Sequence, residues 1–187
     1  NLTASVENEW LCMNLLAEFG LPVAKTAILN FGTQKVLVVE RFDRKMHSSG
    51  KWIMRLPQED FCQALGVPPH LKCESDGGPG LSQLAAVLRG SERAEADLTT
   101  LLTSQLLFWL MAAPDGHAKN FSIHLLPAGR YALAPLYDVM SIWPVCIAFH
   151  CSVALTRLEP GNTLISTPTL AAATSRAIIC TISSRTS

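Results

Sequence analysis

One loop constrains this chain more than any other stretch, because it places polar side chains between two apolar segments. It reads Ala-Pro-Asp115-Gly-His-Ala-Lys-Asn120-Phe-Ser, and it follows an apolar helical pattern over residues 94–113. Residues 121–134 predict a β-hairpin, since two apolar runs flank Pro-Ala-Gly. Asp138 comes a few residues after the second strand. A rigid helix before such a loop gives its side chains the support that a functional site needs.

The residue types in this loop suit phosphoryl transfer, a reaction that depends mainly on positioning and charge neutralisation. The Asp115 carboxylate can orient and deprotonate a hydroxyl group. Oxygens of Asn120 and Asp138 can hold Mg²⁺ against the phosphates of a nucleotide. A catalytic loop, a short hairpin and a metal-binding Asp, in that order, form the layout of a protein-kinase-like active site. The alternative is a plain turn, because Asp-Gly is a common turn dipeptide and D-x-H-x-x-N is a short pattern.

The composition of the chain limits the classes of protein to which it can belong. The 187 residues carry a formal net charge of zero and a charged fraction of 16%, which gives no sign of a nucleic-acid-binding surface. No apolar run reaches the roughly 18 residues of a membrane span. Six scattered cysteines without a C-x-x-C pair indicate reduced thiols in a cytoplasmic protein. The start of the chain has no Met and no signal-peptide pattern, so we expect it to begin within a longer protein.

The first forty residues predict a helix and a hairpin. The helix covers residues 5–19, with Ser5 as its N-cap. Its expected apolar face consists of Trp10, Leu11, Met13, Leu15 and Ala17. The runs 27–31 and 35–39 predict paired strands, and the second is apolar enough to be covered on both faces. Glu9 is interpreted as an ordinary helix residue, because no Lys on a preceding strand is available to pair with it.

The middle of the chain predicts a strand and three helices. Residues 52–56 read as a short strand and residues 57–60 as the start of a helix. The glycine-rich stretch 74–80 is interpreted as a plain loop, because it lacks the Gly-Lys-Ser/Thr of a phosphate-binding loop. A helix over 81–88 follows. The clearest helix, 94–113, is expected to bury Leu98, Leu101, Leu102, Gln105, Leu106 and Trp109.

The strand at 35–39 ends abruptly in the charged stretch 40–44. A two-lobed nucleotide enzyme places its hinge at such a strand end, where backbone groups can pair with a purine. The alternative is a solvated strand end with Arg and Asp side chains in ion pairs. The residues themselves leave both interpretations open.

The described motifs, taken in order, resemble the HipA family of serine/threonine-protein kinase toxins from type II toxin–antitoxin modules. The matching stretches are ENEWLC at 7–12, VVERFDR at 38–44, LPQED at 56–60, ESDGGPG at 74–80, DGHAKNFS at 115–122, and Tyr137-Asp138 followed by Ser141 and Pro144. Each motif is modest, but the ordered set is specific. It covers residues 7–145.

This resemblance implies an α+β, protein-kinase-like two-lobed fold, of which this chain holds a partial N-lobe and a mainly helical C-lobe. It also implies ATP and Mg²⁺ as cofactors. Asp115 would be the catalytic base, and Asn120 and Asp138 would bind the metal. Glu40 and Phe42 would be hinge positions whose backbone meets adenine, and His117 would contact the nucleotide from the catalytic loop.

The resemblance further implies partners and a cellular role. Members phosphorylate a Ser or Thr of a translation-machinery protein, glutamyl-tRNA synthetase in the best-known relatives, and so cause growth arrest and persistence. A HipB-like antitoxin holds them inactive and makes the contact with DNA, so the kinase meets DNA only indirectly. No membrane partner is implied.

Three segments are expected: a partial N-lobe and hinge over 1–43, the helical C-lobe over 44–145, and a tail over 146–187. The tail is rich in Ser and Thr, with Arg157, Glu159, Arg176 and Arg185 as its only charged residues. It does not match the family's motifs, and we hypothesise a shifted reading frame or disorder there. The family's nucleotide-contacting Lys has no counterpart here. We therefore expect weak or no activity from this chain alone, and the alternative function is an inactive remnant that retains at most a protein-binding surface.

Overall fold

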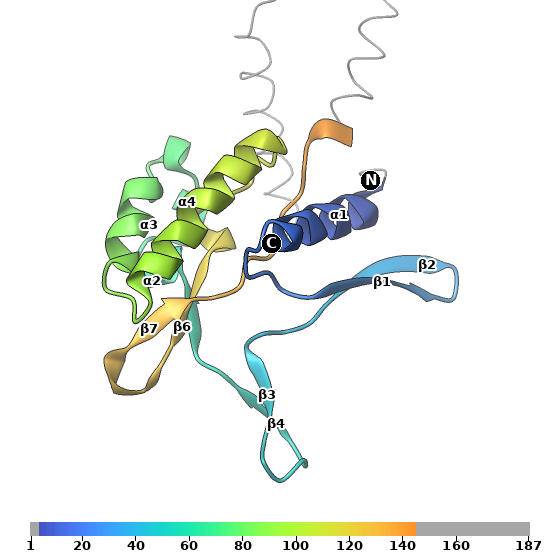
Figure 1. Cartoon of the computed structure of the whole chain (residues 1–187), viewed down its shortest axis with the longest axis horizontal. Coiled ribbons are helices and arrows are strands. Elements are labelled where there is room, and N and C mark those ends of the chain that lie inside the picture. The colour runs from blue at the N-terminus through green and yellow to red at the C-terminus, as the bar shows by residue number, and fades with distance from the viewer. Residues whose placement is uncertain (1–3, 145–187) are drawn as a thin grey trace, which may run out of the picture. The chain divides into compact units, whose positions relative to one another are not determined.

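The computed structural model describes residues 4–144, and residues 4–141 form one compact unit (Figure 1). Its α-helices are α1 (Ser5–Glu18), α2 (Phe61–Ala64), α3 (Leu81–Leu88) and α4 (Ala94–Leu110). Its strands are β1 (Thr26–Phe31), β2 (Gln34–Val39), β3 (Arg44–Met46), β4 (Ile53–Arg55), β5 (Gln58–Asp60), β6 (Ser122–Leu125) and β7 (Tyr131–Leu133). Short 3₁₀-helices cover Pro69–Leu71, Glu74–Asp76, Ala118–Asn120 and Pro127–Gly129. The predicted tail lies outside the described residues.

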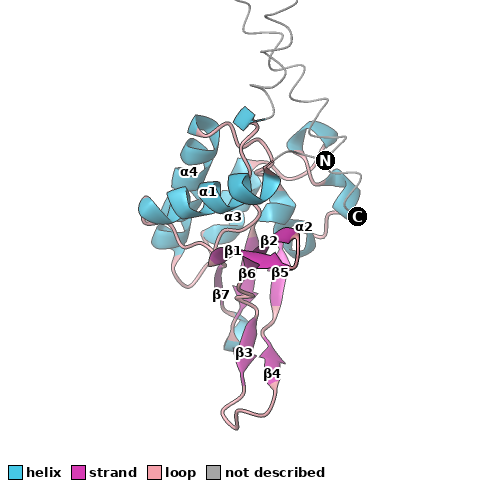
Figure 2. Ribbon diagram, turned by 90° about the vertical axis from the view of Figure 1, so that its right-hand side faces the viewer, coloured by secondary structure: helices cyan, strands magenta, loops and turns pink. Residues whose placement is uncertain are grey.

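The strands form three small antiparallel sheets, β1–β2, β3–β4 and β5–β6–β7. The hairpins predicted at 27–39 and 121–134 are both present, and in the second Ile123 pairs with Leu133. Two strands were not predicted, β3 and β5. The β3–β4 hairpin extends away from the helices in both ribbon views (Figures 1 and 2). Together with the helices, the sheets give the α+β composition that the sequence predicts.

The helix start predicted at 57–60 is wrong, because those residues continue the sheet as β5. Asp60 pairs with Ser122 of β6 and then caps the next helix. Its carboxylate accepts a hydrogen bond of 2.8 Å from the backbone of Gln63, whose side chain accepts one of 3.0 Å from the Asp60 N–H. This reciprocal capping satisfies two donors at the end of the helix. The helix therefore begins at Phe61.

Helix α1 has the predicted extent but differs in its cap and its buried face. Ala4 precedes it in a left-handed conformation with φ of 61°, and Ser5 makes no capping bond. The buried residues are Cys12, Met13 and Leu16. Of the predicted face only Met13 is buried; Trp10, Leu11, Leu15 and Ala17 are exposed. Apolar side chains occur on several sides of this helix, so tertiary packing decides which side is covered.

Helix α4 is also present, yet three of the six residues of its predicted buried face are exposed. Leu101 is fully buried, whereas Leu102, Leu106 and Trp109 are 54%, 56% and 76% exposed. The rotation of the helix is fixed by a polar residue. The buried Asp97 carboxylate accepts a hydrogen bond of 2.8 Å from the backbone of Leu133 in β7 and another from Ser91. A buried carboxylate needs such partners, so this side of α4 must face the sheet.

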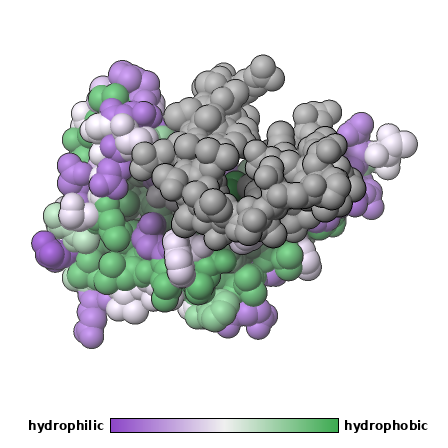
Figure 3. All heavy atoms as spheres, turned by 90° about the horizontal axis from the view of Figure 1, so that it is seen from above, coloured by the Kyte–Doolittle hydropathy of each residue, from purple (hydrophilic) through white to green (hydrophobic). Residues whose placement is uncertain are grey.

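Strand β2 was predicted to be covered on both faces, and this is wrong. Val38 and Val39 are 38% and 37% exposed. Among residues 4–144 their sheet has two strands, and α1 contacts both of them. Apolar surface is visible on the described part of the chain (Figure 3). Within the described residues, no helix has the length and apolar character to cross a membrane.

One core joins the segments that surround the predicted catalytic loop. It contains Met13 and Leu16 of α1, Phe61 of α2, Leu101 of α4, and Phe121 and Leu136 on either side of the β6–β7 hairpin. Each of these side chains is at most 1% exposed. A backbone bridge between Val23 and Leu136 ties the first third of the chain to the segment before Asp138. The loop is therefore held from several elements.

Candidate active site

The catalytic loop folds back against the end of α4. Gly116 lies over the Phe108 ring so closely that a Cβ at this position would be 2.7 Å from a ring carbon. The Phe108 ring in turn packs on Phe121, with their centroids 6.0 Å apart. Only glycine allows this approach without displacing the ring. The contact places Asp115, the residue before Gly116, at the surface beside the core.

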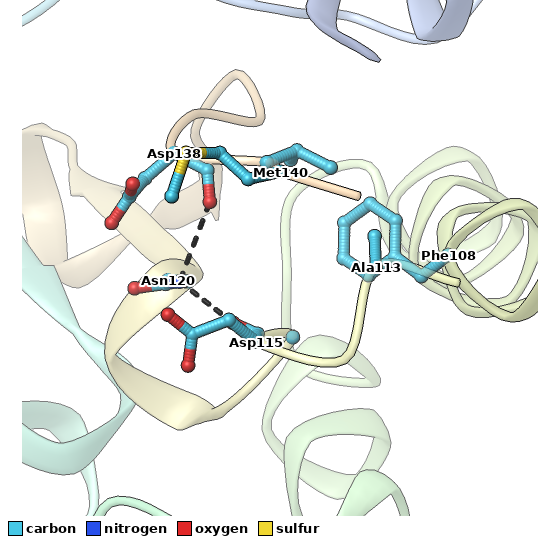
Figure 4. A pocket seen from close by; sticks show the side chains of 8 residues that line it. Phe108, Ala113, Asp115, Asn120, Asp138 and Met140 are labelled. Atoms are coloured by element: carbon cyan, nitrogen blue, oxygen red, sulfur yellow. Dashed lines mark hydrogen bonds between the residues drawn. The ribbon is translucent and has the colours of Figure 1, made fainter. Parts of the chain in front are cut away.

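Asn120 connects the two carboxylate-bearing segments of the site. Its side-chain amide donates a hydrogen bond of 2.7 Å to the carbonyl oxygen of Asp115 and lies 3.5 Å from that of Asp138. Figure 4 shows Asn120 between the other two, joined to both by these contacts. With its amide nitrogen engaged, Asn120 keeps its side-chain oxygen for another partner. The three side chains predicted as catalytic and metal-binding are thus brought together.

Asp138 has a strained backbone and an unusual charge environment. Its φ of 58° is left-handed, a conformation that a non-glycine residue holds at a cost of about 1–3 kcal/mol. Burial raises the pKa of its carboxyl, and the nearby Asp115 carboxylate raises that pKa further. His117 and Lys72 act in the opposite direction. A bound cation would remove the electrostatic conflict between the two carboxylates.

His117 lies beside Asp115, with its Nε2 3.3 Å from a carboxylate oxygen. Burial lowers the pKa of the imidazole, and the Asp115 carboxylate opposes this only in part. The ring is therefore neutral near pH 7, and the contact is not a pair of full charges. His117 Nδ1 is buried without a hydrogen-bond partner within the described residues, and Asp115 Oδ1 is buried with the 3.3 Å contact to His117 Nε2 but no hydrogen bond. Such orphaned polar atoms are typical of a site that completes its bonding with a ligand.

A small hollow lies between these segments. It is lined by Phe108, Ala113, Asp115, Gly116, Asn120, Asp138, Val139 and Met140. Among these lining residues, the polar side chains belong to Asp115, Asn120 and Asp138.

The donor set agrees with Mg²⁺ and argues against a soft metal. No three His, Cys, Asp or Glu side chains cluster to hold a metal by themselves within residues 4–144. Mg²⁺ commonly takes one or two carboxylates and completes its shell with water and phosphate oxygens. The carboxylate of Asp138 and the amide oxygen of Asn120 are ligands of that kind. The residues present therefore fit the cofactor that the motifs imply.

The predicted hinge residues do not line this hollow. Glu40 is exposed, with its carboxylate 3.4 Å from the Lys25 ammonium. Phe42 packs its ring on Tyr137, the residue before Asp138, at a centroid distance of 5.6 Å. The stretch 40–44 also contains the Arg and Asp ion pairs of the alternative interpretation, centred on buried Asp43. Backbone contact of Glu40 and Phe42 with adenine stays a prediction.

Two residues near the site were not predicted to belong to it. Glu9 of α1 lies close enough to Asp138 that the two carboxylates interact, and burial together with Asp138 raises the pKa of Glu9 to about 7. Lys72 influences the pKa of both His117 and Asp138. Each is distant in sequence from the catalytic loop. No local pattern indicates such a contact.

Comparison with known proteins identifies similar sequences. A model of the family described as HipA-like C-terminal domain matches residues 1–183. The chain is 41% identical over 138 residues to putative kinase Y4mE of Sinorhizobium fredii. The aligned region covers 73% of this chain and 32% of the relative. The chain is also 34% identical over 151 residues to the serine/threonine-protein kinase toxin HipA of Shewanella oneidensis. This aligned region covers 73% of the chain and 34% of that toxin.

Solved structures agree with the sequence matches. The complex of Shewanella oneidensis HipA with HipB and operator DNA contains a chain that matches with a TM-score of 0.70 and 30% identity, over 76% of this chain and 36% of that one. The Helicobacter pylori proinflammatory kinase CtkA matches with a TM-score of 0.59 and 15% identity, over 83% and 55%. The likeness to CtkA concerns the fold alone. The predicted α+β, kinase-like fold is thereby confirmed.

The extent of these matches has two consequences. The chain spans about a third of the length of the curated relatives named above. The family match runs to residue 183 and so passes the predicted boundary at 145. The division at 43 and 145 and the proposed reading-frame change stay predictions.

Proposed function

This chain belongs to the family of HipA-like C-terminal domains, and we propose that it carries the catalytic and metal-binding loops of an ATP-dependent serine/threonine-protein kinase toxin. The observation that carries the proposal is the bridge made by Asn120, whose amide nitrogen contacts the carbonyl oxygens of both Asp115 and Asp138. This bridge gathers the partly exposed Asp115 carboxylate, the Asn120 amide oxygen and the exposed Asp138 residue around a single hollow. Phosphoryl transfer requires such an arrangement of groups.

Each side chain takes a role that follows from its environment. The Asp115 carboxylate is 37% exposed, so an incoming hydroxyl group can reach it. It orients that hydroxyl and accepts its proton. The neutral His117 ring keeps one nitrogen available for a hydrogen bond to the nucleotide. Asn120 and Asp138 would hold Mg²⁺, which when bound would neutralise charge on the phosphates.

The relatives support a proposal for the substrate and for the partner. The serine/threonine-protein kinase name of the Shewanella relative supports a Ser or Thr hydroxyl as acceptor. We propose a protein of the translation machinery as substrate, with growth arrest and persistence as the outcome. The solved complex that contains HipA, HipB and operator DNA supports a HipB-like antitoxin as partner, which would contact DNA in place of the kinase. A cytoplasmic location agrees with these partners.

Calorimetric titration of the purified chain with ATP in the presence of Mg²⁺ tests the proposal. The informative variant is Asp138→Asn, because Asn tolerates a left-handed backbone and removes only the charge. Asp76→Asn, in an exposed loop, is the matched control. We expect Mg²⁺-dependent ATP binding that Asp138→Asn abolishes and Asp76→Asn preserves. Equal binding by all three proteins, or none by a chain whose circular dichroism shows it folded, would contradict the proposal and favour the inactive remnant.

A further inference from the structure

Asn8 of α1 holds the chain at Ser141, three residues after Asp138. Its side-chain nitrogen donates a hydrogen bond of 2.6 Å to the Ser141 carbonyl oxygen, and its side-chain oxygen accepts one of 3.1 Å from the Ser141 N–H. A residue brings one backbone donor and one backbone acceptor, so this single amide satisfies both polar groups of Ser141. The two residues are 133 positions apart in the sequence. The contact therefore fastens the Asp138 segment to the first helix.

The Ser141 side chain connects the same segment to the end of α4. Its hydroxyl donates a hydrogen bond of 2.6 Å to the carbonyl oxygen of Met111, which caps the C-terminus of that helix. Carbonyl groups at the end of a helix lack partners within the helix, and this bond satisfies one of them. Asp115 follows Met111 by four residues. Ser141 is therefore fixed both to α1 and to the helix that leads into the catalytic loop.

The orientation of the Asn8 amide is also fixed. Cys12 lies one helical turn further along α1, and its thiol donates to the Asn8 side-chain oxygen at 3.4 Å. Cys12 is 5% exposed, so this side of α1 lies in the core. The amide oxygen thus faces two donors, whereas the nitrogen faces a carbonyl group. A reversed amide would place nitrogen against N–H and oxygen against oxygen at Ser141, so Asn8 holds one orientation.

Asp138 needs support of this kind because its backbone conformation is unfavourable. Its φ of 58° is left-handed, and a non-glycine residue keeps such a conformation only when its surroundings hold it. Before Asp138, the backbone N–H and carbonyl groups of Leu136 each make a hydrogen bond of 2.8 Å to the segment 22–24. After Asp138, the Ser141 backbone pairs with Asn8. Asp138 therefore lies between two fixed points of the chain.

We propose that Asn8 is a positioning residue for the metal site, because it holds Asp138 in the backbone conformation in which that residue lines the hollow. This rests on the proposed function, in which Asn120 and Asp138 bind Mg²⁺. Mg²⁺ demands near-ideal octahedral geometry, so displacement of one ligand weakens binding. Asn8 is not among the residues that line the hollow. It acts through Ser141 and touches neither the metal nor the nucleotide.

Asn8→Ala removes both hydrogen bonds to Ser141, and Asn14→Ala is its matched control. Asn14 lies on the same helix, and its side-chain nitrogen donates a hydrogen bond of 2.7 Å to the Trp10 carbonyl oxygen within α1. In calorimetry on the full chain, Asn8→Ala should bind Mg²⁺·ATP roughly three- to tenfold more weakly, because hydrogen bonds that fix a ligand are lost. Asn14→Ala should bind Mg²⁺·ATP as the unmodified chain does.

NMR separates positioning from a general loss of stability. In labelled chain without metal, the ¹³Cα and ¹³Cβ chemical shifts of Asp138 report its backbone conformation. They should change in Asn8→Ala and stay unchanged in Asn14→Ala. In the unmodified chain, Mg²⁺·ATP should shift the side-chain amide signals of Asn8 and leave those of Asn14 in place. This second readout needs no variant, so it applies even if Asn8→Ala does not fold.

The outcomes separate this inference from the proposed function. An affinity of folded Asn8→Ala for Mg²⁺·ATP within about twofold of the unmodified chain would overturn the role of Asn8 and leave the kinase proposal standing. Unchanged Asp138 shifts in that variant, or unchanged Asn8 signals in a chain that binds Mg²⁺·ATP, would also overturn it. If the unmodified chain shows no ATP binding that depends on Asp138, the proposed function fails. The Asp138 shifts of the metal-free variants then still show whether Asn8 holds that residue.

Discussion

The Tyr137 hydroxyl donates a hydrogen bond of 2.9 Å to the carbonyl oxygen of Lys119. Lys119 precedes Asn120 and Tyr137 precedes Asp138, so one hydroxyl joins the two segments that we propose bind the metal, each at the residue before the proposed ligand. The Ser122 hydroxyl lies 2.6 Å from the Tyr137 hydroxyl oxygen and donates a hydrogen bond to it, because the Tyr137 proton is given to Lys119. Burial raises the pKa of Tyr137 to about 12, so the phenol keeps its proton at neutral pH.

Tyr137→Phe should lower stability and weaken Mg²⁺·ATP binding although it removes no proposed metal ligand. The substitution leaves the part-buried Lys119 carbonyl without its partner, which costs about 1–3 kcal/mol of unfolding free energy. We expect a lower midpoint in urea unfolding and several-fold weaker Mg²⁺·ATP binding. Ser122→Ala keeps the Tyr137–Lys119 bond and should reduce metal affinity less. Greater loss of affinity in Ser122→Ala than in Tyr137→Phe would contradict this assignment.

Glu9→Gln should change how stability depends on pH. The folded-state pKa of Glu9 is raised from 4.5 to about 7, so its favourable contribution is complete below pH 4.5 and is lost as pH rises through about 7. The unmodified chain should therefore lose stability relative to Glu9→Gln between about pH 5 and pH 8. Urea midpoints at several pH values measure this difference. Glu18→Gln, at the exposed end of α1, should follow the unmodified chain; parallel curves for all three proteins would refute the shift.

Asp43→Asn should change how stability depends on pH in the acid range, with the opposite sign to Glu9→Gln. The Asp43 carboxylate accepts two hydrogen bonds of 2.7 Å from Arg41, and Arg44 also contacts it. These partners lower its pKa from 3.8 to about 2. Its contribution is therefore present above about pH 4 and is lost as pH falls towards 2. We expect Asp43→Asn to lower stability at pH 7 by about 2 kcal/mol, less than for a fully buried pair because Arg41 is exposed. Acid titration followed by circular dichroism should show a shallower loss in the variant, and an unchanged profile would contradict the ion-pair cluster.

Gly116→Ala should disturb the loop through Phe108. The added methyl group would lie 2.7 Å from the ring, and overpacking of this kind costs about 1–3 kcal/mol. Phe108→Leu removes the ring atoms that would clash. In thermal unfolding, the loss of stability in the double variant should therefore be smaller than the sum of the losses in the two single variants. Strict additivity would mean that the glycine is not needed for this contact.

The sequence predicts the site better than it predicts the packing. Asp115, Asn120 and Asp138 are separated by a hairpin whose turn and strands are visible in the residue pattern, so their meeting could be anticipated. The buried side of α4 could not be predicted, because leucines lie on several sides of this helix. The hydrogen bond from the Leu133 N–H to the Asp97 carboxylate selects its orientation. Lys72 was missed for a related reason. Its backbone contact with Ala118 joins segments that share no local pattern.

Metal localisation by NMR tests the central claim most directly. Mn²⁺ takes oxygen ligands as Mg²⁺ does, and its unpaired electrons broaden the signals of nearby amides. In a ¹⁵N-labelled chain with ATP, substoichiometric Mn²⁺ should broaden amides of residues 115–120 and 137–139 first, and Asp138→Asn should remove the effect. Broadening centred on the exposed acids Glu74 and Asp76, or spread evenly over the chain, would contradict a metal site between Asn120 and Asp138.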